Sequence, residues 1–238
     1  MSVFAGVFNL DGFPGSLDPI IQVGKSSSPS PSSPGGTGSD DNNNNNDSWS
    51  TFHTITIGNE LIQKSSDRAT AIPSVTAALH KARSILRAAG YQGPVVTVDT
   101  YSMLLAHPEL CDASDYCAAN CHVFFDATQE PRTAGGYARD VARRISRAAG
   151  GGKRTVIAES GWPHAGLANG KAVPGVEEQR DAVGSLKKEF GDGGGGGDDE
   201  GEDDGEDDAG LVLFTAFDDL WKEDNAGTFG AERFWGLH

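Results

Sequence analysis

Two glutamates follow apolar, strand-like runs, Glu60 in the stretch ITIGNE and Glu159 in the stretch TVIAES. A glutamate at a strand end is most often a solvated boundary residue. Two carboxylates that face one cleft, however, are what hydrolysis of an acetal requires, because one protonates the departing oxygen while the other attacks the carbon or activates a water. The chain holds 34 acidic residues, so chance pairs are frequent and the neighbouring residues must decide.

Alternation along a strand assigns each glutamate to a face. Glu60 is expected on the face of Thr56 and Gly58, and Glu159 on the face of Ile157. Both faces can point into a barrel, and both glutamates then lie at carboxyl ends of strands, where barrel enzymes place their chemistry.

The neighbours of Glu159 strengthen this interpretation. Trp162 lies three residues after it, and Trp221 follows the last apolar run. An indole face at a barrel mouth is a natural platform for a sugar ring, although each tryptophan alone is more often a packing residue. Asn120 and His122 are expected on one face at the end of another strand, where polar side chains suit substrate hydroxyls. A buried histidine satisfied by a backbone carbonyl is an equally good interpretation of His122.

The elements that must position these residues alternate between strand-like and helix-like segments. The expected strands are Val3–Asn9, Phe52–Glu60, Gly93–Thr100, Tyr116–Phe125, Lys153–Ser160 and Leu211–Asp219. The expected helices are Ser16–Gly24, Pro73–Ala89, one through Tyr137, Val141 and Ile145, and Val176–Phe190. In the second of these helices Pro73 suits the first turn and Gly90 ends the helix.

This alternation predicts a parallel sheet, and strands rich in Val and Ile on both faces predict that both faces are covered. An open doubly wound sheet and a β/α barrel both fit the pattern. The first strand is not followed by a glycine-rich nucleotide loop, which weakens the dinucleotide-binding version of the open sheet.

Two biased stretches interrupt the pattern, 25–47, rich in Ser, Pro and Asn, and 191–210, rich in Gly, Asp and Glu. Neither buries enough apolar surface to offset the entropy of ordering, so we expect insertions in a single domain spanning 1–238. Without them 195 residues remain to fold. The net charge of −15 falls to −5 without the ten acidic residues of the second stretch, which is expected to be a solvated acidic loop.

The cysteines and the remaining composition argue against several other classes. Three cysteines rule out complete intramolecular pairing. Cys117 and Cys121 would lie about 13 Å apart in one strand, too far for a disulfide, and a zinc site with His122 is disfavoured because Cys121 and His122 would point to opposite faces. We expect no nucleic-acid binding because there is no basic patch, no membrane span because no apolar run is long enough, and no signal peptide at the start of this chain.

Five blocks of sequence resemble the fungal branch of family-17 glycoside hydrolases, the β-1,3-glucanases of cell walls. They read ITIGNELI, ILRAAGYQGPVVTVDT, LCDASDYCAANCHVFF, VIAESGWPHAG and FTAFDDLWKED…FWGL. Their order and spacing fit the family, and the resemblance runs from about Val3 to Leu237, apart from the two insertions.

The resemblance implies a (β/α)8 TIM barrel and a retaining reaction on β-1,3-glucan, with no metal or cofactor. Glu60 matches the acid/base, Glu159 the nucleophile, and Asn59 the partner of the sugar 2-hydroxyl. Lys222 matches a further position of the family, and Asp219 and Trp221 are candidate substrate-binding residues beside it. In a retaining pair the carboxyl groups lie about 5–5.5 Å apart, so the charge of Glu159 favours the protonated form of Glu60.

The implied protein is a monomer of the cell wall or the cell exterior. An Asn46-Asp47-Ser48 sequon in the first insertion would be accessible in a secreted chain. Endo hydrolysis is the leading expectation. An exo-acting β-glucosidase or transglycosylase of the same family is an alternative, and a glucan-binding protein without turnover is another.

Three departures from the family are evident. Asp219 stands where the family usually has Glu. Ala148 and Ala149 stand where it commonly has a cysteine, so Cys111 is expected to be unpaired. The family's first two β/α units have no counterpart, so we expect an incomplete barrel of about six units with two exposed strand edges. Such a chain is expected to fold poorly alone and to have weak or no activity. Closure of a smaller barrel by the two edge strands is the alternative.

Overall fold

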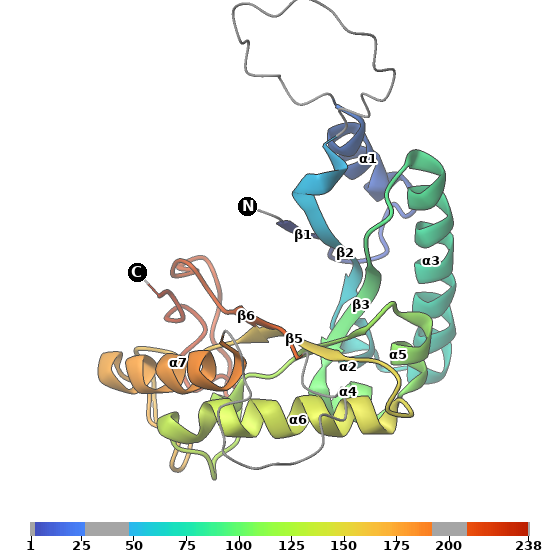
Figure 1. Ribbon diagram of the computed structural model, residues 1–238. Coiled ribbons are helices and arrows are strands. Elements are labelled where there is room, and N and C mark those ends of the chain that lie inside the picture. The colour runs from blue at the N-terminus through green and yellow to red at the C-terminus, as the bar shows by residue number, and fades with distance from the viewer. Residues whose placement is uncertain (1–2, 27–47, 192–208, 238) are drawn as a thin grey trace, which may run out of the picture. The chain divides into compact units, whose positions relative to one another are not determined.

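Figure 1 shows the chain as a computed structural model that describes residues 3–26, 48–191 and 209–237. Most of the two predicted insertions and the sequon's Asn46 and Asp47 lie outside these residues. The strands are β1 Val3–Val7, β2 Phe52–Asn59, β3 Val95–Thr100, β4 Cys117–Asn120, β5 Thr155–Ser160 and β6 Leu211–Leu213. The helices are α1 Asp18–Lys25, α2 Leu61–Lys64, α3 Arg68–Ala89, α4 Tyr101–Ala106, α5 Glu109–Ala113, α6 Ala134–Ala148 and α7 Val176–Phe190.

The strand order in the sheet is the order along the chain, from β1 to β6. The pairs β1–β2, β3–β4, β4–β5 and β5–β6 are all parallel. A doubly wound open sheet reverses its order at a switch point, whereas each strand of a β/α barrel lies beside the next one. The sequential order therefore confirms the α/β prediction, a fold of the (β/α)8 TIM-barrel type represented here by six strands.

The chain divides into two compact units, Met1–Thr97 and Val98–His238, with the division inside β3. In the first unit α3 packs on β2, and the core includes Ile55, Ile57, Leu79 and Leu86, all fully buried. In the second unit α6 packs on both α7 and β5. The buried side chains of these elements hold the strand ends of the second unit in place.

The structure corrects several element boundaries. α3 begins at Arg68 rather than at Pro73, because the Asp67 side chain caps it by accepting the Thr70 N–H at 3.2 Å. Pro73 therefore lies inside the helix, while Gly90 ends it with a φ of 110°, as predicted. Strands β1, β4 and β6 are shorter than expected. After β4 the chain turns into a 3-10 helix at Val123–Phe125, so the expected strand 116–125 is wrong over its second half.

The expectation that Cys111 is unpaired is wrong, because Cys111 forms a disulfide with Cys117. Helix α5 carries Cys111 to the start of β4, and the two Cα atoms lie 4.7 Å apart, within the range that a disulfide spans. The partner of Cys111 is thus only six residues away along the chain, and not near Ala148. Cys121 is the free cysteine, and it is buried.

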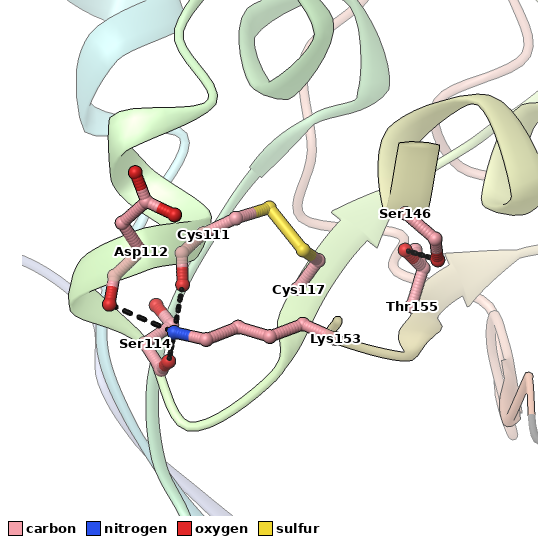
Figure 2. Close-up of a disulfide and its surroundings, with 7 residues drawn as sticks. All are labelled: Cys111, Asp112, Ser114, Cys117, Ser146, Lys153 and Thr155. Carbon is pink, nitrogen blue, oxygen red and sulfur yellow. Dashed lines mark hydrogen bonds between the residues drawn. A yellow bond between two sulfur atoms is a disulfide. The ribbon is translucent and has the colours of Figure 1, made fainter. Parts of the chain in front are cut away.

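The ammonium group of Lys153 reinforces the same corner (Figure 2). Its Nζ donates hydrogen bonds to the backbone carbonyls of Cys111, Asp112 and Ser114, at 2.9, 2.8 and 2.7 Å. These carbonyls lie at the end of α5, where a helix leaves carbonyl oxygens without intrahelical partners and favours a positive charge. Lys153 thereby ties the approach to β5 to the disulfide loop that precedes β4.

Within the described residues, no helix is both long and apolar enough to cross a membrane.

Removal of the disulfide should lower stability without abolishing the fold. The bridge joins residues separated by six positions, and the loop-entropy model gives about 2 kcal/mol for so short a loop. We expect the double variant Cys111→Ala/Cys117→Ala to lose about that free energy of unfolding in urea. The reduced wild-type chain is the matched control and should lose a similar amount. An unchanged midpoint in both would contradict the account of this corner.

Cys121 should be chemically inert in the folded chain. Burial raises the pKa of its thiol to about 12, so only about one thiol in ten thousand is ionised at pH 8. We expect no reaction of the native protein with a disulfide reagent at pH 8. One thiol should appear after unfolding, and three after unfolding with reduction. Fast reaction of the native chain, or three thiols without reductant, would refute the assignment.

Candidate active site

In each of the two units, predicted site residues lie at the carboxyl ends of strands. Asn59 is the last residue of β2 and Asn120 the last of β4, while Glu159 is the last but one of β5. Glu60 follows β2 directly, and His122 follows β4 by two residues. This is the end of a β/α barrel at which catalytic residues are found.

In the first unit Glu60 has a left-handed backbone, with φ 57° and ψ 34°. This conformation is uncommon for a residue with a side chain and costs of order 1 kcal/mol or more, so the surrounding structure must impose it. The prediction that Glu60 continues the alternation of the strand is therefore wrong. Gly58 also has a positive φ, 83°, and the chain turns at Glu60 directly into α2.

The carboxylate of Glu60 has a lysine beside it. Glu60 Oε2 lies 3.4 Å from Lys64 Nζ, one helical turn further on, and the same ammonium lies 5.0 Å from the ring centre of Phe8. Phe8 follows β1, and its carbonyl accepts the N–H of Asn59 at 3.0 Å. The ends of β1 and β2 thus place an exposed aromatic ring, a cation, an amide and a carboxylate along one edge.

In the second unit Glu159 accepts a hydrogen bond from His122, with 3.2 Å between Oε2 and Nε2. The two side chains are 29% and 17% exposed, so the pair is accessible but largely shielded. A carboxylate only accepts, so the hydrogen must lie on Nε2. His122 Nδ1 is buried without a hydrogen-bond partner among the described residues, so Nε2 carries the one hydrogen bond of the ring. The carbonyl-satisfied interpretation of His122 is wrong.

Asn120 lies beside this pair. It is the register partner of Glu159 across β4 and β5, and it is 2% exposed. The next residue, Cys121, donates its N–H to the Glu159 carbonyl at 2.8 Å. Register and contact thus bring Asn120, His122 and Glu159 together at the ends of β4 and β5, while their roles in binding and catalysis stay predictions.

Three aromatic rings surround the imidazole of His122. Phe214 and Trp235 lie edge-on to it, each with a centre-to-centre distance of 5.0 Å, and Phe125 lies at 6.3 Å. Sequence reasoning quoted Phe214 and Trp235 within matched blocks but assigned neither to the site. Their positions could have indicated this role, because Phe214 directly follows the last strand and Trp235 lies in the aromatic tail FWGL.

Gly161 explains how Phe214 reaches this position. A Cβ at Gly161 would collide with the Phe214 carbonyl, and the Phe214 N–H bonds the Ser160 carbonyl at 2.8 Å. Only glycine allows β6 to approach the end of β5 so closely. The glycine of the Glu-Ser-Gly-Trp-Pro sequence is thus required by packing of the site.

The prediction that Trp162 is a platform for a sugar ring is wrong. It is fully buried, its Nε1 donates to the Val173 carbonyl at 2.8 Å, and it packs edge-on against Phe124 at 5.5 Å. A ring with both faces covered offers no platform to a sugar. Trp221, by contrast, is 79% exposed and retains an open indole face.

Asp219 and Lys222 form an ion pair at 3.2 Å, although the aspartate is one methylene shorter than the family's usual glutamate. Lys222 Nζ also lies 3.9 Å from Glu232 and 4.8 Å from the ring centre of Phe214. Glu232 is a further residue that sequence reasoning missed. This cluster packs against the same ring that touches His122.

The structure thus joins Asn120, His122, Glu159, Asp219 and Lys222 within the second unit, with Phe214 and Trp235 added. Asn59 and Glu60 lie together in the first unit. The spacing of the two carboxylates, Glu60 and Glu159, stays a prediction. Among the described residues there is no group of three His, Cys, Asp or Glu side chains placed to hold a metal ion.

Comparisons with known proteins place the chain among fungal glycosidases. The family model described as the BtgE/BtgC glycoside hydrolase domain matches residues 36–236. The chain is 35% identical over 237 residues to the Cell surface mannoprotein MP65 of Candida albicans, covering 99% of this chain and 52% of that protein. It is 40% identical over 191 residues to the Saccharomyces cerevisiae protein named "Probable family 17 glucosidase SCW4", covering 80% of this chain and 44% of that one. The chain therefore spans about half the length of these curated relatives.

A solved structure supports the fold independently. The glycoside hydrolase family 17 β-1,3-glucanosyltransferase of Rhizomucor miehei superposes with a TM-score of 0.68 at 18% identity, covering 100% of this chain and 71% of that chain. At that identity the likeness concerns the fold, and it agrees with the sequential strand order. Because the family model matches residues 36–236, most of this chain, the chain belongs to the fungal family 17 glycoside hydrolases that carry the BtgE/BtgC domain.

Proposed function

We propose that this chain performs retaining hydrolysis of β-1,3-glucan at the fungal cell surface, with Glu159 as nucleophile and Glu60 as acid/base. The observation that carries the proposal is the contact between His122 and Glu159 at the strand ends of a family 17 domain. The Nε2–H of His122 donates to Oε2 and fixes the orientation of the carboxylate. The other oxygen, Oε1, is then available for attack.

The reaction divides into two displacements. In the first, a Glu159 oxygen bonds to the sugar's anomeric carbon while Glu60 gives its proton to the departing glycosidic oxygen. In the second, Glu60 takes a proton from water, the water oxygen bonds to the same carbon, and the bond to Glu159 breaks. A sugar hydroxyl in place of water gives transfer instead of hydrolysis. The step requires Glu60 and Glu159 to lie about 5–5.5 Å apart.

The substrate assignment rests on the relatives and on the exposed aromatic groups. A second solved structure with the same fold is an active-site mutant of the Rhizomucor miehei enzyme in complex with laminaritriose, with a TM-score of 0.60. Trp221 and Phe8 are exposed rings near the strand ends of their respective units, and such rings suit the apolar faces of glucose units. Asn59 and Asn120 suit its hydroxyls.

The cell-surface location has two supports. One relative is named a cell surface mannoprotein. The Cys111–Cys117 disulfide is the kind of bond that persists in oxidising compartments and at cell surfaces.

Carboxamide variants test the two catalytic roles separately. We expect Glu159→Gln and Glu60→Gln each to lose at least about 100-fold in reducing sugar released from a linear β-1,3-glucan. Glu60→Gln should retain more turnover on an aryl glycoside with a good leaving group, which departs without a proton, whereas Glu159→Gln should not. Glu109→Gln, which changes an exposed side chain of α5, is the control and should match the wild type. Equal activity in all four proteins would refute the proposal.

Product analysis tests the mode of action. We expect a mixture of short oligosaccharides from early times, released first as the β-anomer because two displacements retain configuration. Glucose alone would establish the exo alternative, and products longer than the substrate would establish transfer. Binding to insoluble glucan without any product would support a non-catalytic binding protein and contradict the hydrolase.

A further inference from the structure

The segment 234–237 makes backbone hydrogen bonds on both sides of Trp235. The Phe234 carbonyl accepts the His164 N–H at 2.8 Å, and the Trp235 carbonyl accepts the Thr215 N–H at 3.2 Å. The Leu237 N–H donates to the Thr215 carbonyl at 3.0 Å. An irregular segment with so many partners has a fixed position rather than a loosely packed one.

A single carboxylate fastens this segment to the loop after β5. Asp218 Oδ1 accepts the Gly236 N–H at 2.8 Å, and His164 Nε2 lies 3.0 and 3.1 Å from the two oxygens of Asp218. The His164 ring also packs against Phe234 at 5.7 Å. Asp218 thus connects the loop after β6, the loop after β5 and the segment that carries Trp235. None of these contacts is used by the proposed chemistry.

A second side chain holds the same segment from α7. Gln179 Nε2 donates to the Gly236 carbonyl at 3.1 Å and to the Trp162 carbonyl at 2.8 Å. Gly236 therefore has both its N–H and its carbonyl bound to side chains from different elements. The peptide that follows Trp235 is fixed on both sides, which leaves the indole little freedom.

Trp235 transmits this restraint to the active site. It is 3% exposed, and it lies 5.0 Å from the His122 ring, 5.7 Å from Phe214 and 5.8 Å from Phe125. Close packing means that a shift of the indole opens space beside the imidazole. His122 in turn donates a hydrogen bond from Nε2 to Glu159 Oε2.

We propose that Asp218, with His164 and Gln179, is a positioning residue for the nucleophile. It holds Trp235 against His122 so that the imidazole stays directed at Glu159 Oε2. The inference rests on the proposed role of Glu159. A displacement of about 1 Å at a reacting group can cost about 100-fold in rate. The contact of Asp218 with Gly236 can therefore affect the chemical step although Asp218 acts on Glu159 only through Trp235 and His122.

The first experiment compares Asp218→Ala with Asp218→Asn in the full chain. We expect Asp218→Ala to lower kcat on linear β-1,3-glucan by about 10- to 100-fold, with KM within about threefold of the wild type. Asp218→Asn keeps an oxygen acceptor of the same size and should recover much of the loss. Asp224→Ala is the matched control, because Asp224 Oδ1 accepts the Glu232 N–H in the same loop, at 3.0 Å, rather than that of Gly236.

The second readout is the histidine ring spectrum, which is independent of turnover. Six histidines give a small set of ring signals, and His122→Gln identifies the one of interest. The His122 signal should shift and broaden in Asp218→Ala, because the neighbouring indole moves, and should stay unchanged in Asp224→Ala. Gln179→Ala provides a second test of the same segment and should shift the signal in the same sense.

The outcomes separate this inference from the proposed function. If the wild type does not turn over glucan but the His122 signal responds as expected, the positioning is upheld and the proposed function fails. If the wild type is active and Asp218→Ala leaves kcat and the His122 signal unchanged, the positioning is refuted. An equal loss in Asp224→Ala also refutes it, because the effect is then general destabilisation of the loop.

Discussion

The hydrogen bond from His122 Nε2 to Glu159 Oε2 is the interaction around which the second unit is arranged. A carboxylate at a strand end has many possible orientations, and an imidazole beside it selects among them. The imidazole itself makes one hydrogen bond from Nε2 and is otherwise surrounded by rings, so its orientation depends on packing. The close approach at Gly161 and the bonded segment around Trp235 both supply that packing.

The orientation of Glu60 is set by its backbone conformation and an ion pair. Its left-handed backbone is imposed where β2 turns into α2, and Lys64 pairs with its carboxylate one turn later. Backbone conformations that a residue type seldom adopts are concentrated at functional sites, and Glu60 combines such a conformation with a carboxylate at a strand end. The nucleophile candidate is thus oriented by side-chain packing, and the acid/base candidate by its own backbone.

Much of the fold follows from patterns that the sequence displays directly. α7 has the predicted bounds, Val176–Phe190, and β5 ends at the predicted residue, because apolar periodicity and flanking glycines define both. The parallel sheet followed from the regular alternation of strands and helices, whereas the barrel-type order was implied by the family resemblance. Boundaries that depend on competing local signals were less predictable, as at α3, where the Asp67 cap starts the helix before Pro73.

Only part of the candidate site could be predicted from the sequence, and the reason is physical. Strand-end positions of Asn120 and Glu159 follow from alternation within one short segment. The burial of Trp162 depends on Phe124 and Val173, and the role of Trp235 depends on contacts with residues far along the chain. The Cys111–Cys117 bridge was missed because the sequence alone does not show that α5 brings these residues within 4.7 Å. Long-range packing, rather than local pattern, decides such features.

The central claim is that Glu159 forms a covalent bond to the sugar. The most direct measurement is to treat the protein with an activated 2-deoxy-2-fluoro derivative of a β-1,3-linked glucose disaccharide, which slows release of the intermediate, and to map the labelled peptide by mass spectrometry. The account predicts one added disaccharide on the peptide that carries Glu159, and none in Glu159→Gln. A label on another carboxylate, or turnover of glucan with inversion and no label, would contradict it.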